Sequence, residues 1–315
     1  MISRRILRIK ALQILYAYYK CPDSSINKAE KELFHSINKT YELYHYLILL
    51  LLEIADYANS RIEIARQKNI PSAEDLHPNT KFVSNKIISQ FRSSVELNKF
   101  LNNIRLSWVN HPELIKKLYN KIRMTDHFIK YMESKDISYE NDKEILYKIY
   151  TDDISTFDEL YVVLEEQSIY WNDEVEFVIG IILKTIKGFK ESDRENIRLF
   201  PLFKNSDDSD FVKRLIRKAI LHKDEYLDLI KKYTQNWEID RIAFMDILIL
   251  ELAITEVVEF TSIPTKVTFN EYLEIAKYYS TNKSSVFING VLDKIIKYLK
   301  DNNKVLKQGR GLVGE

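Results

Sequence analysis

The fold is decided by the stretch Trp237–Lys300, which reads WEIDRIAFMDILILELAITEVVEFTSIPTKVTFNEYLEIAKYYSTNKSSVFINGVLDKIIKYLK. Between Ile239 and Val258 the apolar residues cover nearly the whole circumference of a helix instead of one stripe. That pattern is typical of a helix that is buried on all sides. We therefore expect this helix to be the centre of the core.

One carboxylate, that of Asp246, falls on an apolar face of this helix. A buried carboxylate needs a partner, and Lys277 or a helix-end amide could supply it. A structural role in helix packing is favoured over an acid/base site, because the sequence places no second catalytic group nearby.

Two further helices complete the stretch. Pro264 separates the central helix from the next, for which Thr268 and Glu271 have the spacing of a capping box. Ser284 or Ser285 can cap the last helix. Its Asn289–Gly290 pair is interpreted as a packing position, since a glycine inside a helix permits close approach of a neighbour.

Composition favours an all-helical protein. The 315 residues are 45% hydrophobic, yet include only 6 Gly and 6 Pro, fewer turn residues than a sheet-based fold needs. The single cysteine, Cys21, excludes an internal disulfide framework. The longest apolar run, Leu47–Leu52, is too short to span a bilayer, and no secretion signal is visible. We expect a cytoplasmic protein without membrane contact.

Charge is unevenly distributed along the chain. Residues 1–20 carry a local charge of +5 and residues 277–310 carry +6, whereas residues 132–176 carry −11. The two basic segments could meet a polyanion. For the acidic segment, a solvated surface over an aromatic core is favoured over a docking face for a basic partner.

The first helix is expected to begin after Ser3 and to end near Tyr19. Arg4, Arg5 and Arg8 share one arc of its first two turns. Cations at a helix N-terminus oppose the macrodipole at a cost of about 0.3–1 kcal/mol each. A bound phosphate would reverse that sign.

Between the two ends, the pattern indicates further helices and no internal repeat. They are expected over 25–70 (one long helix or a pair), 84–106, 112–132, 156–167 and 172–188.

The sequence resembles the NusB family of bacterial transcription antitermination factors. The resemblance is carried by DRIAFMDILILELAITE, IPTKVTFNEYLEIAKYYS and KSSVFINGVLDK, and by the ALQ.LY motif of the first helix. It covers about residues 1–20 and 210–300, and the segment between them is a large helical insertion whose role the resemblance does not give.

The resemblance implies an RNA-binding factor that acts at ribosomal RNA operons. Such a factor binds a boxA element in single-stranded RNA together with NusE, a protein of the small ribosomal subunit, within the transcription elongation complex. The residues to which it assigns contact with RNA are Arg4, Arg5, Arg8, Lys10, Gln13, Tyr16 and, beside the partner protein, Phe287.

The predicted architecture is an all-α, NusB-like helical bundle with an enlarged N-terminal helical subdomain. It comprises an N-terminal region over 1–209, a C-terminal bundle over 210–302 and a flexible tail over 303–315. Two alternatives remain: a protein-interaction scaffold that has lost RNA binding, and an accessory module of the ribosomal RNA methyltransferase type without a catalytic domain.

No catalytic, metal or cofactor site is predicted. The 6 histidines are isolated, and no phosphate-binding loop is present. Gly309, Gly311 and Gly314 form a literal G-x-G-x-x-G, but no strand precedes it.

Overall fold

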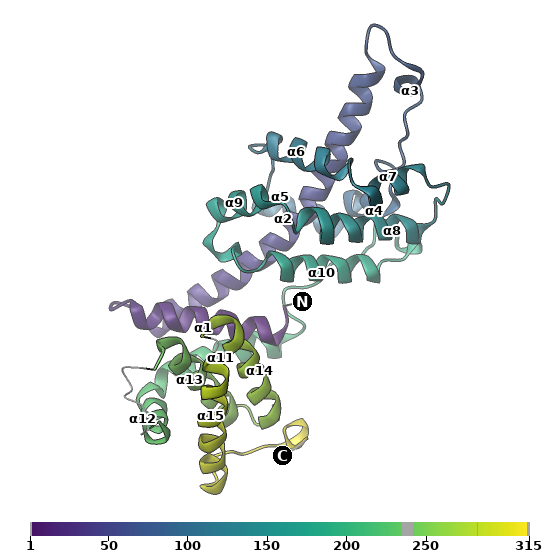
Figure 1. Cartoon of the computed structure of the whole chain (residues 1–315). Coiled ribbons are helices and arrows are strands. Elements are labelled where there is room, and N and C mark those ends of the chain that lie inside the picture. The colour runs from purple at the N-terminus through teal and green to yellow at the C-terminus, as the bar shows by residue number, and fades with distance from the viewer. Residues whose placement is uncertain (1, 235–241, 282, 314–315) are drawn as a thin grey trace. The chain divides into compact units, whose positions relative to one another are not determined.

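The computed structural model describes residues 2–234, 242–281 and 283–313. Throughout these residues every regular element is a helix, and no strand occurs (Figure 1). The predicted all-α class is confirmed. The expected start of the central helix, around Trp237 and Ile239, lies outside the described residues.

The chain forms two compact units. Unit 1 comprises Met1–Ile37 and Phe203–Glu315, and unit 2 comprises Asn38–Leu202. The boundary between them falls inside one long helix, α2 (Ile26–Arg66). The units differ from the predicted division at residue 209, because the N-terminal segment packs with the C-terminal part of the chain.

Unit 1 is a bundle around α13 (Phe244–Glu259). Every residue of α13 from Leu248 to Val257 is buried, which confirms the prediction from the all-round apolar pattern. The helices that pack against it are α1 (Arg4–Lys20), α11 (Ser206–Leu221), α12 (Lys223–Tyr233), α14 (Thr265–Tyr279) and α15 (Ser284–Asp301).

Asp246 is buried and has partners, as the sequence required, but they are serines. The Ser280 hydroxyl donates to one carboxylate oxygen, and the Ser284 hydroxyl donates to the other at 2.8 Å. The predicted partner Lys277 instead forms an ion pair with Glu274. Asp246 thus ties α13 to the start of α15.

The predicted capping box of α14 is wrong. This helix begins earlier, at Thr265 directly after Pro264, so Thr268 and Glu271 lie inside it. The Thr268 hydroxyl donates to Glu256 at 2.8 Å, and the carboxylate of Glu271 accepts from Arg5. Both side chains make tertiary contacts instead of capping the helix.

The segment after α15 returns to the bundle, although a flexible tail was expected there. The Lys307 ammonium donates to the carbonyls of Val257 and Phe260, both at 3.0 Å, at the end of α13. The Gln308 amide donates to the Thr261 carbonyl at 3.0 Å. Free carbonyls at a helix end attract a cation, so this return is electrostatically favourable.

Unit 2 is an insertion made of short helices around the second part of α2. They are α3 (Ala73–Leu76), α4 (Lys86–Ser93), α5 (Val95–Ile104), α6 (Pro112–Ile122), α7 (Asp126–Glu133), α8 (Tyr139–Lys148), the π-helix η1 (Ile149–Ile154), α9 (Asp158–Gln167), the 3-10 helix η2 (Ile169–Trp171), α10 (Val175–Gly188) and the 3-10 helix η3 (Glu191–Asp193).

Aromatic side chains hold the core of unit 2 together. Trp108 stacks on Tyr46 with ring centroids 3.9 Å apart, and its indole N–H donates to the Tyr46 carbonyl. From the acidic segment, Tyr150 and Trp171 are both buried in this core. The segment's aromatics therefore pack inward, in agreement with the favoured interpretation.

Two functional features are absent from the described part of the chain. No helix there is both long and apolar enough to cross a bilayer. Nor does any group of three or more His, Cys, Asp or Glu side chains there have the arrangement of a metal site.

Candidate nucleic-acid interface

The first helix begins where the sequence predicts. The Ser3 hydroxyl accepts a hydrogen bond from the Ile6 amide, and α1 then runs to Lys20. Its first turn contains no acidic residue. Carboxylates from other helices instead neutralise the arginines of its first two turns.

Arg8 is the innermost of these arginines. It is 3% exposed, and its guanidinium donates two hydrogen bonds of 2.7 Å to the carboxylate of Glu256, which is 0% exposed. Burial opposes the charge of Arg8, but the hydrogen bonds and the negative charge of Glu256 outweigh it and raise the pKa of Arg8. The hydroxyls of Thr268 and Tyr272 also donate to Glu256.

Arg4 and Arg5 lie nearer the surface. The Arg4 guanidinium donates to Asp208 of α11 at 2.9 Å, with the Arg4 side chain 39% exposed. Arg5 donates two hydrogen bonds of 2.8 Å to Glu271 of α14, with its side chain 50% exposed. These hydrogen bonds, the largest cause, lower the pKa of Glu271 and raise that of Arg5.

The structure therefore corrects part of the predicted site. Arg8 and Lys10 are both buried, at 3% and 1% exposure, so neither presents its charge to a phosphate. A helical wheel cannot reveal this, because the Arg8 partner Glu256 is 248 positions away. Arg4 and Arg5 keep part of their surface open.

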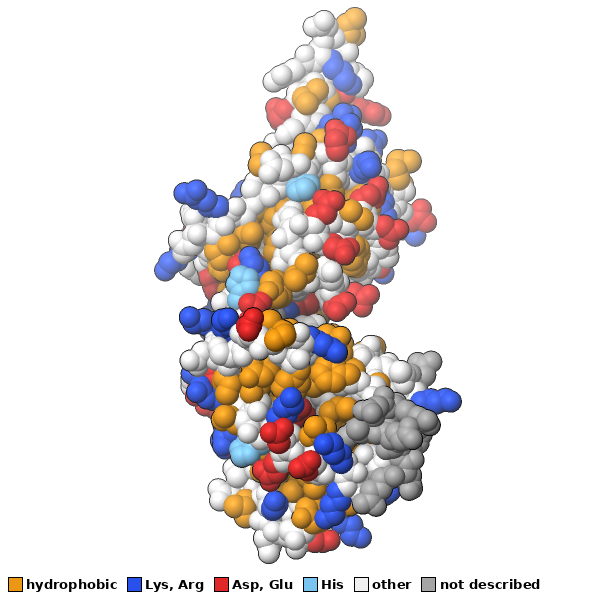
Figure 2. Space-filling view, turned by 90° about the vertical axis from the view of Figure 1, so that its left-hand side faces the viewer, with side chains coloured by type: hydrophobic (Ala, Val, Ile, Leu, Met, Phe, Trp, Pro, Cys, Tyr) orange, Lys and Arg blue, Asp and Glu red, His pale blue; other side chains and the backbone are white. Residues whose placement is uncertain are grey.

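One outward face of α1 gathers the remaining predicted residues. Arg5 and Tyr16 are exposed and Gln13 is partly exposed on this face, which ends at Lys20. Tyr16 contacts the Phe244 ring edge-on at 5.5 Å, and the Lys20 ammonium lies 4.5 Å from the centroid of that ring. Figure 2 shows that one side of unit 1 carries hydrophobic side chains interspersed with charged side chains of both signs.

Sequence reasoning missed Phe244 and Lys20 as members of this face. Lys20 follows Tyr16 by one helical turn, which was a usable signal. Phe244 gave none, because an aromatic residue inside an apolar stretch is normally interpreted as core.

A second feature is a shallow groove between α14 and α15. Its lining residues are Asn270, Leu273, Glu274, Lys277, Ser285, Val286 and Asn289. Glu274 follows Glu271, the hydrogen-bond partner of Arg5, by one turn of α14, so the groove borders the start of α1.

The structure bears on two expectations for α15 and corrects one of them, the packing role of Asn289 and Gly290. Phe287 is partly buried, and the side chain that lines the groove at this turn is its 75%-exposed neighbour Val286. Asn289 and Gly290 are exposed, and among the described residues no atom comes within 4 Å of a Cβ added to Gly290. The predicted packing role of this pair is therefore wrong.

Behind the aromatic face lies a second buried carboxylate, that of Glu251. The Tyr19 hydroxyl donates to it, and the Lys223 ammonium lies 4.4 Å from the Tyr19 ring centroid. Burial raises the pKa of Glu251 to about 8, against the opposing effects of the Tyr19 hydrogen bond and the Lys223 charge. Because the carboxylate is only 3% exposed, we interpret it as a structural group.

Unit 1 is thus an all-helical bundle whose first helix shows a mixed cationic and aromatic face. Residues 183–297 match the model of the NusB family. The match begins earlier than the resemblance from residue 210 and includes the end of α10.

Curated relatives match the same part of the chain. The transcription antitermination protein NusB of Salinibacter ruber is 42% identical over 114 residues, which are 36% of this chain and 71% of the relative. NusB of Natranaerobius thermophilus is 37% identical over 95 residues, 30% of this chain and 68% of the relative. NusB of Chloroherpeton thalassium is 40% identical over 104 residues, 33% of this chain and 49% of the relative.

The chain belongs to the NusB family of transcription antitermination proteins. No solved structure matches the chain. The predicted family and the NusB-like bundle are confirmed, and the part of unit 2 before residue 183 lies outside the family match.

Proposed function

We propose that unit 1 binds single-stranded RNA of the boxA type together with NusE, as part of a transcription elongation complex. Membership of an antitermination family supports this function. The structural observation that supports RNA binding is the outward face of α1, which contains Arg5, Gln13 and Tyr16. Arg4 and Phe287 are proposed at the margins of the RNA surface.

Binding would use two kinds of contact. The half-exposed guanidinium of Arg5 can exchange one oxygen of Glu271 for a phosphate oxygen, since arginine forks bind either group. The 40%-exposed ring of Tyr16 can stack an unpaired base, and Lys20 adds a cation beside it.

The buried Arg8 would act indirectly in this proposal. Its double hydrogen bond to Glu256 fixes the first two turns of α1 on the bundle, and thereby the direction in which Arg5 projects. Its role would be to position the RNA-binding side chains without touching RNA.

The test compares Arg5→Ala with Arg198→Ala, an exposed arginine of unit 2, in binding of a labelled boxA RNA with and without NusE. Arg5→Ala should weaken binding and lower the salt slope by about 0.7 for each phosphate that the protein no longer neutralises. Tyr16→Ala should weaken binding by about 1–3 kcal/mol with an unchanged slope. An unchanged slope in Arg5→Ala would remove this helix face from the site. A protein-only scaffold would show no salt-dependent RNA binding at all.

A further inference from the structure

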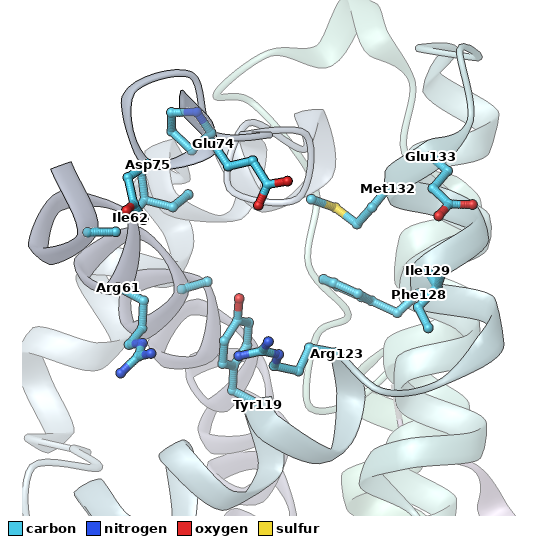
Figure 3. A pocket seen from close by; sticks show the side chains of 13 residues that line it. Arg61, Ile62, Glu74, Asp75, Tyr119, Arg123, Phe128, Ile129, Met132 and Glu133 are labelled. Carbon is cyan, nitrogen blue, oxygen red and sulfur yellow. The ribbon is translucent and has the colours of Figure 1, made fainter. Parts of the chain in front are cut away.

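Unit 2 contains a cleft for which the NusB family gives no role. It opens where α2, α3, α6 and α7 meet, and Figure 3 shows its lining side chains. Its volume of about 400 Å³ lies within the range of small-molecule sites. The lining residues are Ala58, Arg61, Ile62, Ala65, Glu74, Asp75, Pro78, Tyr119, Arg123, Phe128, Ile129, Met132 and Glu133.

Two cations occupy one side of this cleft. Arg61 lies on α2 and Arg123 at the end of α6, with the Tyr119 ring between them (Figure 3). Among the described residues, neither guanidinium takes part in an ion pair or a side-chain hydrogen bond. By contrast, the neighbouring Arg66 pairs with Glu63.

The hydroxyl of Tyr119 is the third donor on this side. Its ring is held by an edge-on contact with Tyr57, with centroids 5.5 Å apart. Burial raises the pKa of Tyr119, while the positive charges of Arg123 and Arg61 oppose the rise. In the described part of the chain this hydroxyl has no hydrogen-bond partner.

The remaining walls are largely apolar, but three carboxylates also line the cleft, those of Glu74, Asp75 and Glu133. Phe128 and Met132 project from α7 toward the space above the Tyr119 hydroxyl, and Glu74 faces that space from α3 (Figure 3). Asp75 is already neutralised, because the Lys68 ammonium donates to both of its oxygens at 2.9 Å. Arg61, Arg123 and Tyr119 therefore line one side of the cleft, opposite a largely apolar wall, and the exposed carboxylates of Glu74 and Glu133 lie across from them.

We propose that this cleft binds a phosphomonoester of nucleotide size, with its phosphate held by Arg61, Arg123 and Tyr119. Three separate donors suit the three terminal oxygens of a tetrahedral phosphate better than the two oxygens of a planar carboxylate. The apolar wall accommodates the organic body of the ligand, and Glu74 accepts a hydrogen bond from its far end. The same carboxylate repels a longer phosphate chain, so a monophosphate is preferred to a triphosphate.

The test is calorimetric titration of the full chain with adenosine 5′-monophosphate, adenosine, adenosine 5′-triphosphate and inorganic phosphate. The monophosphate should bind most tightly. Arg61→Ala and Arg123→Ala should each weaken its binding about tenfold or more, and Tyr119→Phe severalfold. Arg198→Ala, which removes an exposed arginine of the same unit, should leave binding unchanged. Glu74→Gln should narrow the preference for the monophosphate over the triphosphate.

A second arm distinguishes a free nucleotide from the 5′ end of an RNA chain. Short RNAs with a 5′-phosphate or a 5′-hydroxyl are compared in Arg5→Ala protein, which keeps the cleft intact. A preference for the RNA with a 5′-phosphate that disappears with Arg61→Ala assigns the cleft to RNA ends. If the two RNAs bind equally well, the cleft is assigned to the free nucleotide. If no phosphomonoester binds at millimolar concentration, or if both arginine variants bind as tightly as the wild type, the proposal is overturned. Neither result bears on the function proposed for unit 1.

Discussion

The guanidinium of Arg8 and the carboxylate of Glu256 form two parallel hydrogen bonds of 2.7 Å between α1 and the central helix α13. Both side chains are buried, and Glu256 accepts further hydrogen bonds from Thr268 and Tyr272 of α14. One carboxylate therefore joins three helices of unit 1.

Arg8→Ala should destabilise the protein by about 3–5 kcal/mol, because it leaves the buried carboxylate of Glu256 without its cation. Urea unfolding monitored by circular dichroism measures the destabilisation. Arg4→Ala is the matched control, since its partly exposed pair with Asp208 is worth at most about 1 kcal/mol. Equal effects of the two substitutions would contradict the structural role assigned to Arg8.

The stability of unit 1 should fall as the pH rises from about 5 to about 8 through the titration of Glu251. Burial raises the pKa of this carboxyl from 4.5 to about 8, so within that range the folded state holds a proton that the unfolded state has released. Glu251→Gln removes the titration while keeping an acceptor for Tyr19. Its melting temperature should exceed that of the wild type at the alkaline end only. A parallel pH dependence in both proteins would exclude Glu251 as the cause.

Asp246→Ala should cost about 1–3 kcal/mol, because it removes the acceptor of the partly buried Ser280 hydroxyl and of the buried Ser284 hydroxyl. The change in the urea midpoint gives the magnitude. Asp293→Ala, on the exposed face of α15, is the comparison and should be nearly neutral. A neutral Asp246→Ala would show that this carboxylate does not connect α13 to α15.

Gly311→Ala should detach the C-terminal segment from the bundle. A Cβ at this position would overlap the carbonyl oxygen of Thr261, so the backbone would have to move apart. Hydrogen exchange at the Gln308 amide, which donates to that carbonyl, should accelerate. Gly290→Ala is the control: it has open space, and alanine in a helix should stabilise by about 0.5–1 kcal/mol. Unchanged protection at Gln308 would mean that this segment does not depend on the close approach.

Local signals in the sequence predicted the helices of unit 1 well. Ser3 caps α1 as expected, and the all-round apolar pattern identified the buried central helix. Both depend on side chains a few positions apart, which a periodicity captures. The capping box at Thr268 failed because the same spacing served contacts with Glu256 and Arg5.

The insertion was predicted less accurately, because its breaks are small. The expected helix over 84–106 is divided at Ser94, whose hydroxyl accepts from the Leu97 amide and so starts α5. The expected helix over 112–132 is likewise two helices, α6 and α7. Neither break contains Gly or Pro, the residues by which sequence reasoning finds a helix end.

The candidate site was predicted only in part, for a reason of distance along the chain. Whether an arginine faces solvent or a buried acid depends on Asp208, Glu256 and Glu271, each more than 200 positions from the arginine that it pairs with. The sequence showed the cations as one arc, and the fold provides each with a different neighbour. Only Arg5 remains about half open.

Because Arg5 pairs with Glu271, binding at the outward face of α1 is coupled to binding at the groove between α14 and α15. Glu271 lies on α14, the helix that also supplies Glu274 and Lys277 to the neighbouring groove. Any polyanion that draws Arg5 away leaves Glu271 with only the more distant cation of Arg8, at 3.6 Å, and this loss of positive charge favours a basic side chain arriving at the groove. Occupancy of one surface therefore promotes occupancy of the other by the same factor in both directions.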